Sequence, residues 1–176
     1  RLLFSSNTSG DPSYDNAEPC ITDGTAAGSR RLANINHARS NSLNSPTYAW
    51  GHRFVFSAPT ATSLATRPQL IDDPAAAPRT FLAPANPTGS VRIIAAAQAQ
   101  QGLYLAVTYS GGGLPASICD LWYVPDPNDP DAAIRCARFD SNQIVNQIAC
   151  YGESAAFLLK YPGSIFQRTI ATLWVT

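Results

Sequence analysis

The most concentrated group of oxygen ligands in the sequence lies in the segment Asp126-Pro-Asn-Asp-Pro-Asp131. Asp126, Asn128, Asp129 and Asp131 supply carboxylate and amide oxygens, the ligands that Ca²⁺ prefers when several come from one tight loop. The segment lacks the glycine and the terminal glutamate of an EF-hand loop, and its two prolines stiffen the backbone. It is therefore a candidate calcium site, although a turn that joins two strands is the more frequent origin of such a pattern.

An aspartate and two aromatic residues lie close together at Asp120, Trp122 and Tyr123. Sugar sites combine an aromatic ring, which stacks on the sugar, with a polar side chain that binds a hydroxyl group. These three residues are therefore a candidate carbohydrate site. Further aromatic candidates are Trp50, Tyr104, Tyr109 and Tyr151. Most of the aromatic residues occupy alternating strand positions, where burial in the core is the more frequent outcome.

The four cysteines, Cys20, Cys119, Cys136 and Cys150, form no C-x-x-C pair. Their even number predicts two disulfides, with three pairings open, and an oxidising or extracellular compartment. Buried free thiols are the alternative. A metal or catalytic role is less favoured, because a zinc site usually contains at least one close pair of ligands.

The sequence has two histidines, His37 and His52, and no G-x-S-x-G motif. Hydrolytic triads and multi-histidine metal sites need a histidine beside a nucleophile, a carboxylate or another ligand. The two glutamates offer no obvious carboxylate pair for glycoside hydrolysis, unless distant residues form one. We therefore expect no enzyme activity and no cofactor, and keep a secreted hydrolase as the third functional hypothesis.

Asn7 begins an acceptable N-glycosylation sequon, Asn7-Thr8-Ser9, whereas the match at Asn86 is blocked by the proline that follows it. In a secreted eukaryotic protein we expect Asn7 to be exposed and to be a candidate for glycosylation.

Alternating apolar residues and regularly spaced Gly or Pro predict an all-β chain. Strands are expected at 2–4, 48–56, 118–124, 133–139, 143–151, 155–161 and 165–175, and a hairpin is expected over 90–109. Both faces of 165–175 are partly apolar, which predicts a central strand. The proline-rich stretch 59–90 predicts only short edge strands or ordered coil, as at 69–71 and 80–82. Residues 30–43 allow one short helix.

The expected fold is an antiparallel sandwich or barrel of about eight to ten strands with at most one or two short helices. Residues 1–47 are expected to form an N-terminal coil or arm with the short helix, and residues 48–176 a β domain. A faint internal similarity at an interval of about 41 residues leaves a β-trefoil open as the alternative.

Charged residues make up 14% of the chain, against about 25% in an ordinary soluble domain. Eleven Arg stand against one Lys, and ten Asp against two Glu, so the net charge is zero. Lys and Glu usually cover exposed helix faces, and their scarcity argues against a helical bundle. The scattered, balanced arginines argue against a nucleic-acid surface. The sequence contains no run of 18 apolar residues, so it predicts no membrane helix.

A neutral surface rich in amides, hydroxyls and prolines lowers the cost of packing one subunit against another. The leading hypothesis is a non-catalytic structural protein that self-assembles, as a filament, coat or spike subunit, in an extracellular, cell-surface or virion-surface location. Its expected partners are further copies of itself or other subunits. A carbohydrate-binding, lectin-like module with glycans as partners is the second hypothesis.

Overall fold

The computed structural model describes residues 2–7, 17–32, 46–60, 63–72, 77–82, 89–111, 118–126, 128–129, 132–139, 143–160 and 168–174. These residues contain fourteen β-strands and no α-helix, and every strand pair is antiparallel. The all-β, antiparallel prediction is therefore confirmed.

The strands form four sheets, and in each sheet the strands follow one another in chain order as a meander. Sheet A contains β1 (Leu2–Asn7), β2 (Ala17–Thr22) and β3 (Arg30–Arg31). Sheet B contains β4 (Tyr48–Trp50), β5 (Arg53–Thr60), β6 (Ser63–Ile71) and β7 (Arg79–Thr80). Sheet C contains β8 (Ser90–Gln98), β9 (Leu103–Ser110), β10 (Cys119–Val124) and β11 (Ile134–Phe139). Sheet D contains β12 (Ile144–Tyr151), β13 (Ser154–Lys160) and β14 (Arg168–Trp174).

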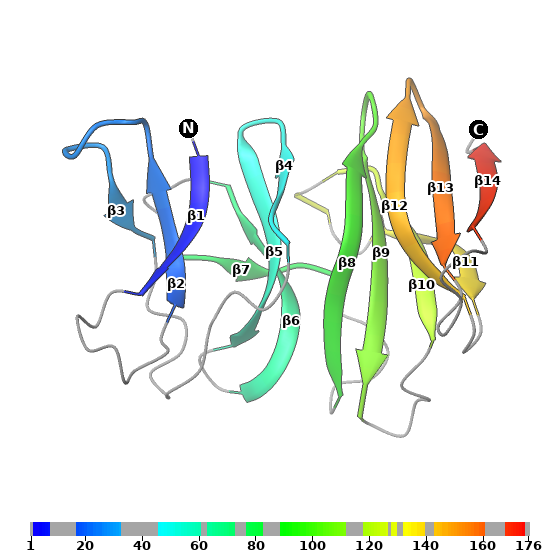
Figure 1. Ribbon diagram of the computed structural model, residues 1–176, viewed down its shortest axis with the longest axis horizontal. Helices are drawn as coiled ribbons and strands as arrows, with labels where there is room; N and C mark the ends of the chain where they lie inside the picture. Colours follow the sequence, from blue (N-terminus) through cyan, green and yellow to red (C-terminus); the bar gives the residue numbers. More distant parts are fainter. Residues whose placement is uncertain are drawn as a thin grey trace.

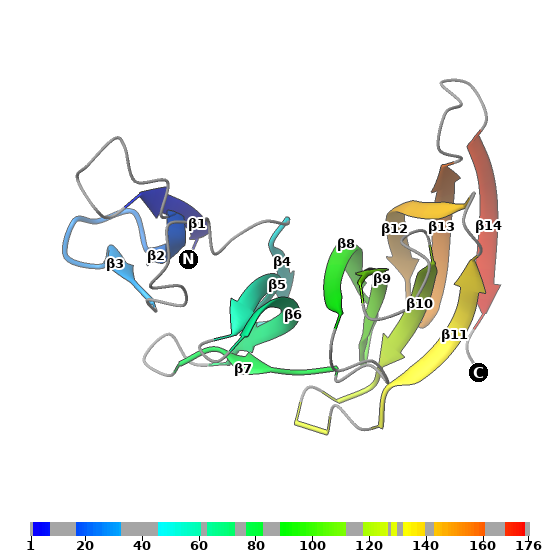
Figure 2. The same cartoon turned by 90° about the horizontal axis from the view of Figure 1, so that it is seen from below.

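The four sheets follow one another along the long axis of the molecule, with sheets A and D at the two ends (Figures 1 and 2). Three apolar clusters join them. Sheets A and B share Leu3, Phe56, Ala58 and Ile71. Sheets B and C share a larger core that includes Val55, Leu70, Ile93, Leu105 and Val107. Sheets C and D share a core that includes Ala106, Leu121, Val145, Phe157 and Leu159. Each inner sheet is thus packed on both faces.

Strand β9 shows how the sequence supports this double packing. Leu103, Leu105 and Val107 belong to the core with sheet B, whereas Tyr104 and Ala106 belong to the core with sheet D. Because successive side chains of a strand point to opposite faces, a nearly continuous apolar run is what a doubly covered strand requires. The segment expected to be central, 165–175, contains β14 instead, which pairs only with β13 among the described strands. Apolar residues on both faces of a strand do not determine its order in the sheet.

The hairpin predicted at 90–109 is confirmed as β8 and β9, closed by a hydrogen bond from the Ala99 N–H to the Gly102 carbonyl at 2.9 Å. The single strand predicted at 48–56 is instead the hairpin of β4 and β5. Gly51 has a φ of 61° and stands first in the two-residue turn, where type II′ hairpins need glycine.

The proline-rich region contains a longer strand than the sequence predicted, because β6 spans nine residues. Pro68 donates no ladder hydrogen bond, yet its carbonyl accepts one from the Phe81 N–H at 3.1 Å. The N-terminal segment also differs from the expected coil, since β1, β2 and β3 lie within it. Of the helix predicted at 30–43, Arg30 and Arg31 form β3, and residues 33–43 lie outside the described residues.

Candidate functional site

Asp120 of the predicted sugar site is fully buried and forms the centre of an ion-pair cluster in sheet C. It lies directly opposite Arg138 of β11. Arg138 donates from Nε to Oδ1 at 2.7 Å and from Nη2 to Oδ2 at 2.8 Å, and the Tyr109 hydroxyl donates to Oδ2 at 2.8 Å. A carboxylate bonded three times to protein groups is held in place and neutralised, so here Asp120 stabilises the sheet.

The two aromatic neighbours of Asp120 are also directed inward. The Trp122 ring packs against the core between sheets B and C. Its buried indole nitrogen makes no hydrogen bond of normal geometry within the described residues, although it lies close enough to the Tyr109 hydroxyl to lower that phenol's pKa. Burial and the negative Asp120 carboxylate outweigh this effect and raise the pKa of Tyr109 to about 12.

Tyr123 belongs to a second cluster, which ties sheet C to sheet D. Its ring packs on Tyr104 with centroids 4.9 Å apart, and its hydroxyl donates to Glu153 Oε2 at 3.1 Å. The Tyr104 hydroxyl donates to the Glu153 carbonyl at 3.0 Å, and the Gln101 N–H donates to Oε1 at 2.8 Å. Burial raises the pKa of Tyr104 to about 12. Glu153 therefore fixes the turn that precedes β13 against the β8–β9 hairpin.

The hairpin turns of three successive sheets lie side by side and are hydrogen-bonded to one another. The Gly51 N–H donates to Gln98 Oε1 at 2.8 Å, and the Gln100 N–H donates to the Gly152 carbonyl at 3.1 Å. We call the residues of these three turns, 51–52, 98–102 and 151–153, the turn surface. Tyr151 is its most exposed aromatic side chain, at 92%. Of the six aromatic residues considered for sugar stacking, it is the one that the structure leaves exposed.

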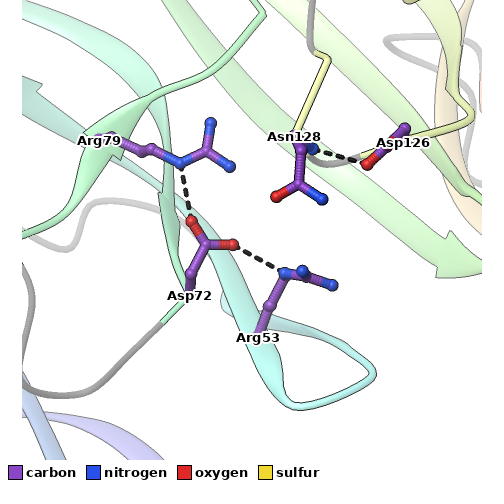
Figure 3. Close-up of polar contacts among 5 residues, drawn as sticks. All are labelled: Arg53, Asp72, Arg79, Asp126 and Asn128. Atoms are coloured by element: carbon purple, nitrogen blue, oxygen red, sulfur yellow. Dashed lines mark hydrogen bonds and ion pairs between the residues drawn. The ribbon is translucent and has the colours of Figure 1, made fainter.

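The acidic loop is arranged as the turn that the sequence favoured. Asp126 Oδ1 accepts the Asn128 N–H at 2.8 Å, as Figure 3 shows, and the Asp126 carbonyl accepts the Asp129 N–H at 3.2 Å. No group of three or more candidate metal ligands from His, Cys, Asp and Glu occurs among the residues that the structure describes. Asp131 lies outside them. Calcium binding by this loop stays a prediction.

A further charged cluster, which the sequence did not reveal, joins three strands or strand ends of sheet B (Figure 3). Asp72 accepts from Arg53 Nε at Oδ1 and from Arg79 Nε at Oδ2, both at 2.7 Å. Partial burial would raise the pKa of Asp72, but the hydrogen bonds and charges of Arg79 and Arg53 outweigh it and hold that pKa below its ordinary value. The cluster fastens the end of β6 between its two neighbours.

All four cysteines are free thiols in the structure, where the sequence predicted two disulfides. Cys20 lies on β2 of sheet A, and the other three lie on β10, β11 and β12 of sheets C and D. The Sγ atoms of Cys136 and Cys150 each approach a backbone carbonyl at 3.6 Å, that of Ile134 and that of Ala97 respectively. Cysteine number alone could not show this separation between sheets.

The glycosylation candidate Asn7 is the last residue of β1 and pairs with Ala17. Its side chain lies outside what the structure describes, as does His37. His52 is an exposed residue of the turn surface.

One face of sheet D is covered by sheet C, whereas no apolar cluster of the described residues joins another sheet to the opposite face. The cross-strand pairs Val145–Leu159 and Ile148–Phe157 point toward sheet C and are buried. The pairs that alternate with them, Gln147–Leu158 and Ala149–Ala156, point away from sheet C. We define the outward face of sheet D by its residues on β12 and β13, which are Ile144, Gln147, Ala149, Tyr151, Ser154, Ala156, Leu158 and Lys160.

No family model, no curated protein and no solved structure matches this chain. In the part of the chain that the structure describes, no helix is long and apolar enough to cross a membrane.

The structure separates the residues that the sequence grouped together. Asp120 and Tyr123 belong to two different polar clusters. They are three positions apart on the strand, and residues separated by an odd number of positions face opposite sides of the sheet. The partners Arg138, Tyr109 and Glu153 were missed. An aspartate and an arginine on consecutive predicted strands were a signal for the first cluster, but the register that pairs them was not readable from the sequence.

Proposed function

We propose that this chain is a non-catalytic structural protein that self-assembles through the faces of its β-sheets, as a filament, coat or spike subunit. The observation that carries the proposal is the packing of the inner sheets: sheets B and C are each covered on both faces by another sheet. A molecule built by serial face-to-face packing can extend by the same contacts at its ends.

The composition supports the same function. With 14% charged residues and a net charge of zero, copies of the chain repel one another little and lose little charge hydration on contact. Five of the described charged residues are also engaged within the molecule, in the Asp120–Arg138 pair and in the cluster of Asp72 with Arg53 and Arg79. An extracellular, cell-surface or virion-surface location belongs to this proposal.

Sedimentation equilibrium from low to high micromolar concentration tests the proposal. We expect dimers or larger species whose mass rises with concentration. Because the contacts are apolar, raising NaCl from about 0.1 to 1 M should not dissociate them, whereas association through exposed ion pairs should weaken. A monomer throughout the concentration range would contradict self-assembly.

A second candidate function, carbohydrate binding, is favoured by the exposure of Tyr151 beside the amide side chains of the turn surface. An exposed ring stacks on an apolar sugar face, and amides bind hydroxyl groups. Glycan-array binding that is lost in Tyr151→Ala and kept in Tyr48→Phe, a half-buried tyrosine outside the turn surface, would support it. The absence of any hit at millimolar glycan would exclude it.

A further inference from the structure

Strands β5 and β9, which belong to the inner sheets B and C, carry apolar residues on both faces. Strand β5 directs Val55 toward sheet C and Phe56 toward sheet A, and β9 directs Leu105 toward sheet B and Ala106 toward sheet D. Successive meanders packed in this way are the arrangement of blades in a β-propeller, where repetition leaves few uncovered faces. In sheets B and C, the second strand has apolar residues on both faces, and a neighbouring sheet packs against each face.

Strand β13 has the same two-sided pattern, but among the described residues a neighbouring sheet covers only one of its faces. Ala155, Phe157 and Leu159 are buried against sheet C. Ala156 and Leu158, which alternate with them, are only half-buried. None of the three apolar clusters of the described residues includes Ala156 or Leu158, and the outward face of sheet D lies at the end of the row of sheets in Figure 2. β13 therefore has the apolar pattern of a strand in an inner sheet, although sheet D lies at the end of the row.

Edge strand β11 of sheet C is poorly suited to pair with a strand of another copy. A β-bulge between Leu121 and Trp122 interrupts the pairing of β10 with the edge strand β11. β11 also carries Arg135, which is exposed, and Arg138, which is committed to Asp120. Bulges and charges on an edge strand prevent another strand from pairing with it.

We infer that the outward face of sheet D packs against the same face of a second copy of the chain, which covers it as sheet C covers the other face. This inference rests on the proposed self-assembly and specifies its contact. Ala149 and Ala156, which are direct partners, form a shallow centre. Leu158 lies in the next cross-strand pair of this face, and Ile144 lies in the pair beyond it. Small residues next to larger ones let two sheet faces interlock.

The charges favour this partner over sheet A of the second copy. Lys160 is the one charged residue of the outward face on β12 and β13, and its register partner on β14 is Arg168. A two-fold axis perpendicular to the strands places the two Lys160 side chains at opposite ends of the contact. Sheet A instead ends in β3, whose residues Arg30 and Arg31 are both exposed, and brings further positive charge toward Lys160. A two-fold contact also needs only one surface on each copy.

The first test substitutes Leu158 in the full chain. Leu158→Lys places a charge in the contact, and we expect the dimer dissociation constant from sedimentation equilibrium to rise about tenfold or more, as expected for losing one buried leucine. Ile134→Lys is the matched control, because Ile134 is 53% exposed on edge strand β11 and lies outside the contact. Near-UV circular dichroism verifies that both variants are folded.

A photo-crosslinker at Gln147 gives a second measurement that does not depend on the stability of the Leu158 variant. Gln147 is exposed and pairs with Leu158, so crosslinked dimers should join it to a peptide from β12 or β13 of the other copy. The same crosslinker at Gln101, on the turn surface, should give none.

The two proposals fail in different ways. If the chain associates but Leu158→Lys and Ile134→Lys associate equally well, or Gln147 links to another sheet, the outward-face contact is overturned and self-assembly stands. If the unmodified chain is monomeric at high micromolar concentration, both are overturned.

Discussion

Asp120 and Arg138 face each other across β10 and β11, and the guanidinium group spans both carboxylate oxygens at 2.7 and 2.8 Å. The aspartate side chain has no exposed surface, whereas that of the arginine is 41% exposed. The pair therefore joins an inner strand to an edge strand and places the positive group on the solvent side. The hydrogen bond and negative charge of Asp120 raise the pKa of Arg138 further, which keeps the arginine charged.

Removing the arginine leaves the buried carboxylate without its counter-charge. We expect Arg138→Met to lower the free energy of unfolding by about 3 kcal/mol, the lower end for breaking a buried ion pair, because Arg138 is partly solvated. Arg135→Met on the same strand is the matched control and should change stability by less than about 0.5 kcal/mol. Urea denaturation measures both, and equal midpoints for the two variants would contradict the structural role of the pair.

The Asp72 cluster predicts a specific loss of stability in acid. Its folded-state pKa lies below the ordinary 3.8, so the unfolded chain takes up the proton first as the pH falls. The stabilisation is therefore complete above that ordinary value and is lost as the pH falls through the lower folded value. Asp72→Asn should unfold more easily at pH 7 and show a flatter decline below about pH 4.

Asp126→Asn provides the control for this pH series, because an asparagine oxygen can still accept the Asn128 N–H. Thermal unfolding of the three proteins from pH 7 to pH 2 makes the comparison. The same acid decline in Asp72→Asn and in the unmodified chain would show that Asp72 does not contribute.

The four free thiols should differ in reactivity toward a disulfide reagent. Burial raises the pKa of Cys119 to about 11 and also raises the pKa of the other three thiols. The thiolate is the reactive form, so all rates should increase with pH. Half-buried Cys136 and Cys150 should react before buried Cys20 and Cys119. Four thiols should titrate in denaturant without reductant, and a smaller number would indicate disulfides.

Gly102 is required for the contact between the β8–β9 turn and β10. A Cβ atom there would lie 2.6 Å from the Tyr123 ring and 2.7 Å from the Val124 carbonyl oxygen. We expect Gly102→Ala to cost about 2–3 kcal/mol of unfolding free energy, as overpacking of a filled site does.

Gly152→Ala is the comparison for this substitution, because Gly152 has a φ of 60° and no atom near its added Cβ. It should cost only the backbone strain, about 1 kcal/mol. If the Gly102→Ala and Gly152→Ala variants unfolded at the same urea concentration, the contact between residue 102 and the Tyr123 ring would not be tight.

Part of the site could have been read from the sequence and part could not. The turn at Asp126 could be predicted, because proline and aspartate favour a turn whose hydrogen bonds join residues only two or three positions apart. The environment of Asp120 was not, since its partners Tyr109 and Arg138 are 11 and 18 residues away. The same limit applies to Asp72, whose partners Arg79 and Arg53 are 7 and 19 residues away on other strands.

The amino-acid sequence by itself determined that the chain is β-structured and low in charge, because alternation and turn residues act over a few neighbours. It also determined the β8–β9 hairpin, whose strands meet across a short turn. Only the tertiary structure decided which faces are covered. β9 and β13 have similar apolar patterns, yet one is enclosed between two sheets and the other has an outward face. Whether a second sheet covers a given face depends on the position of the sheet in the row. That position arises from contacts between distant segments and not from the pattern within a strand.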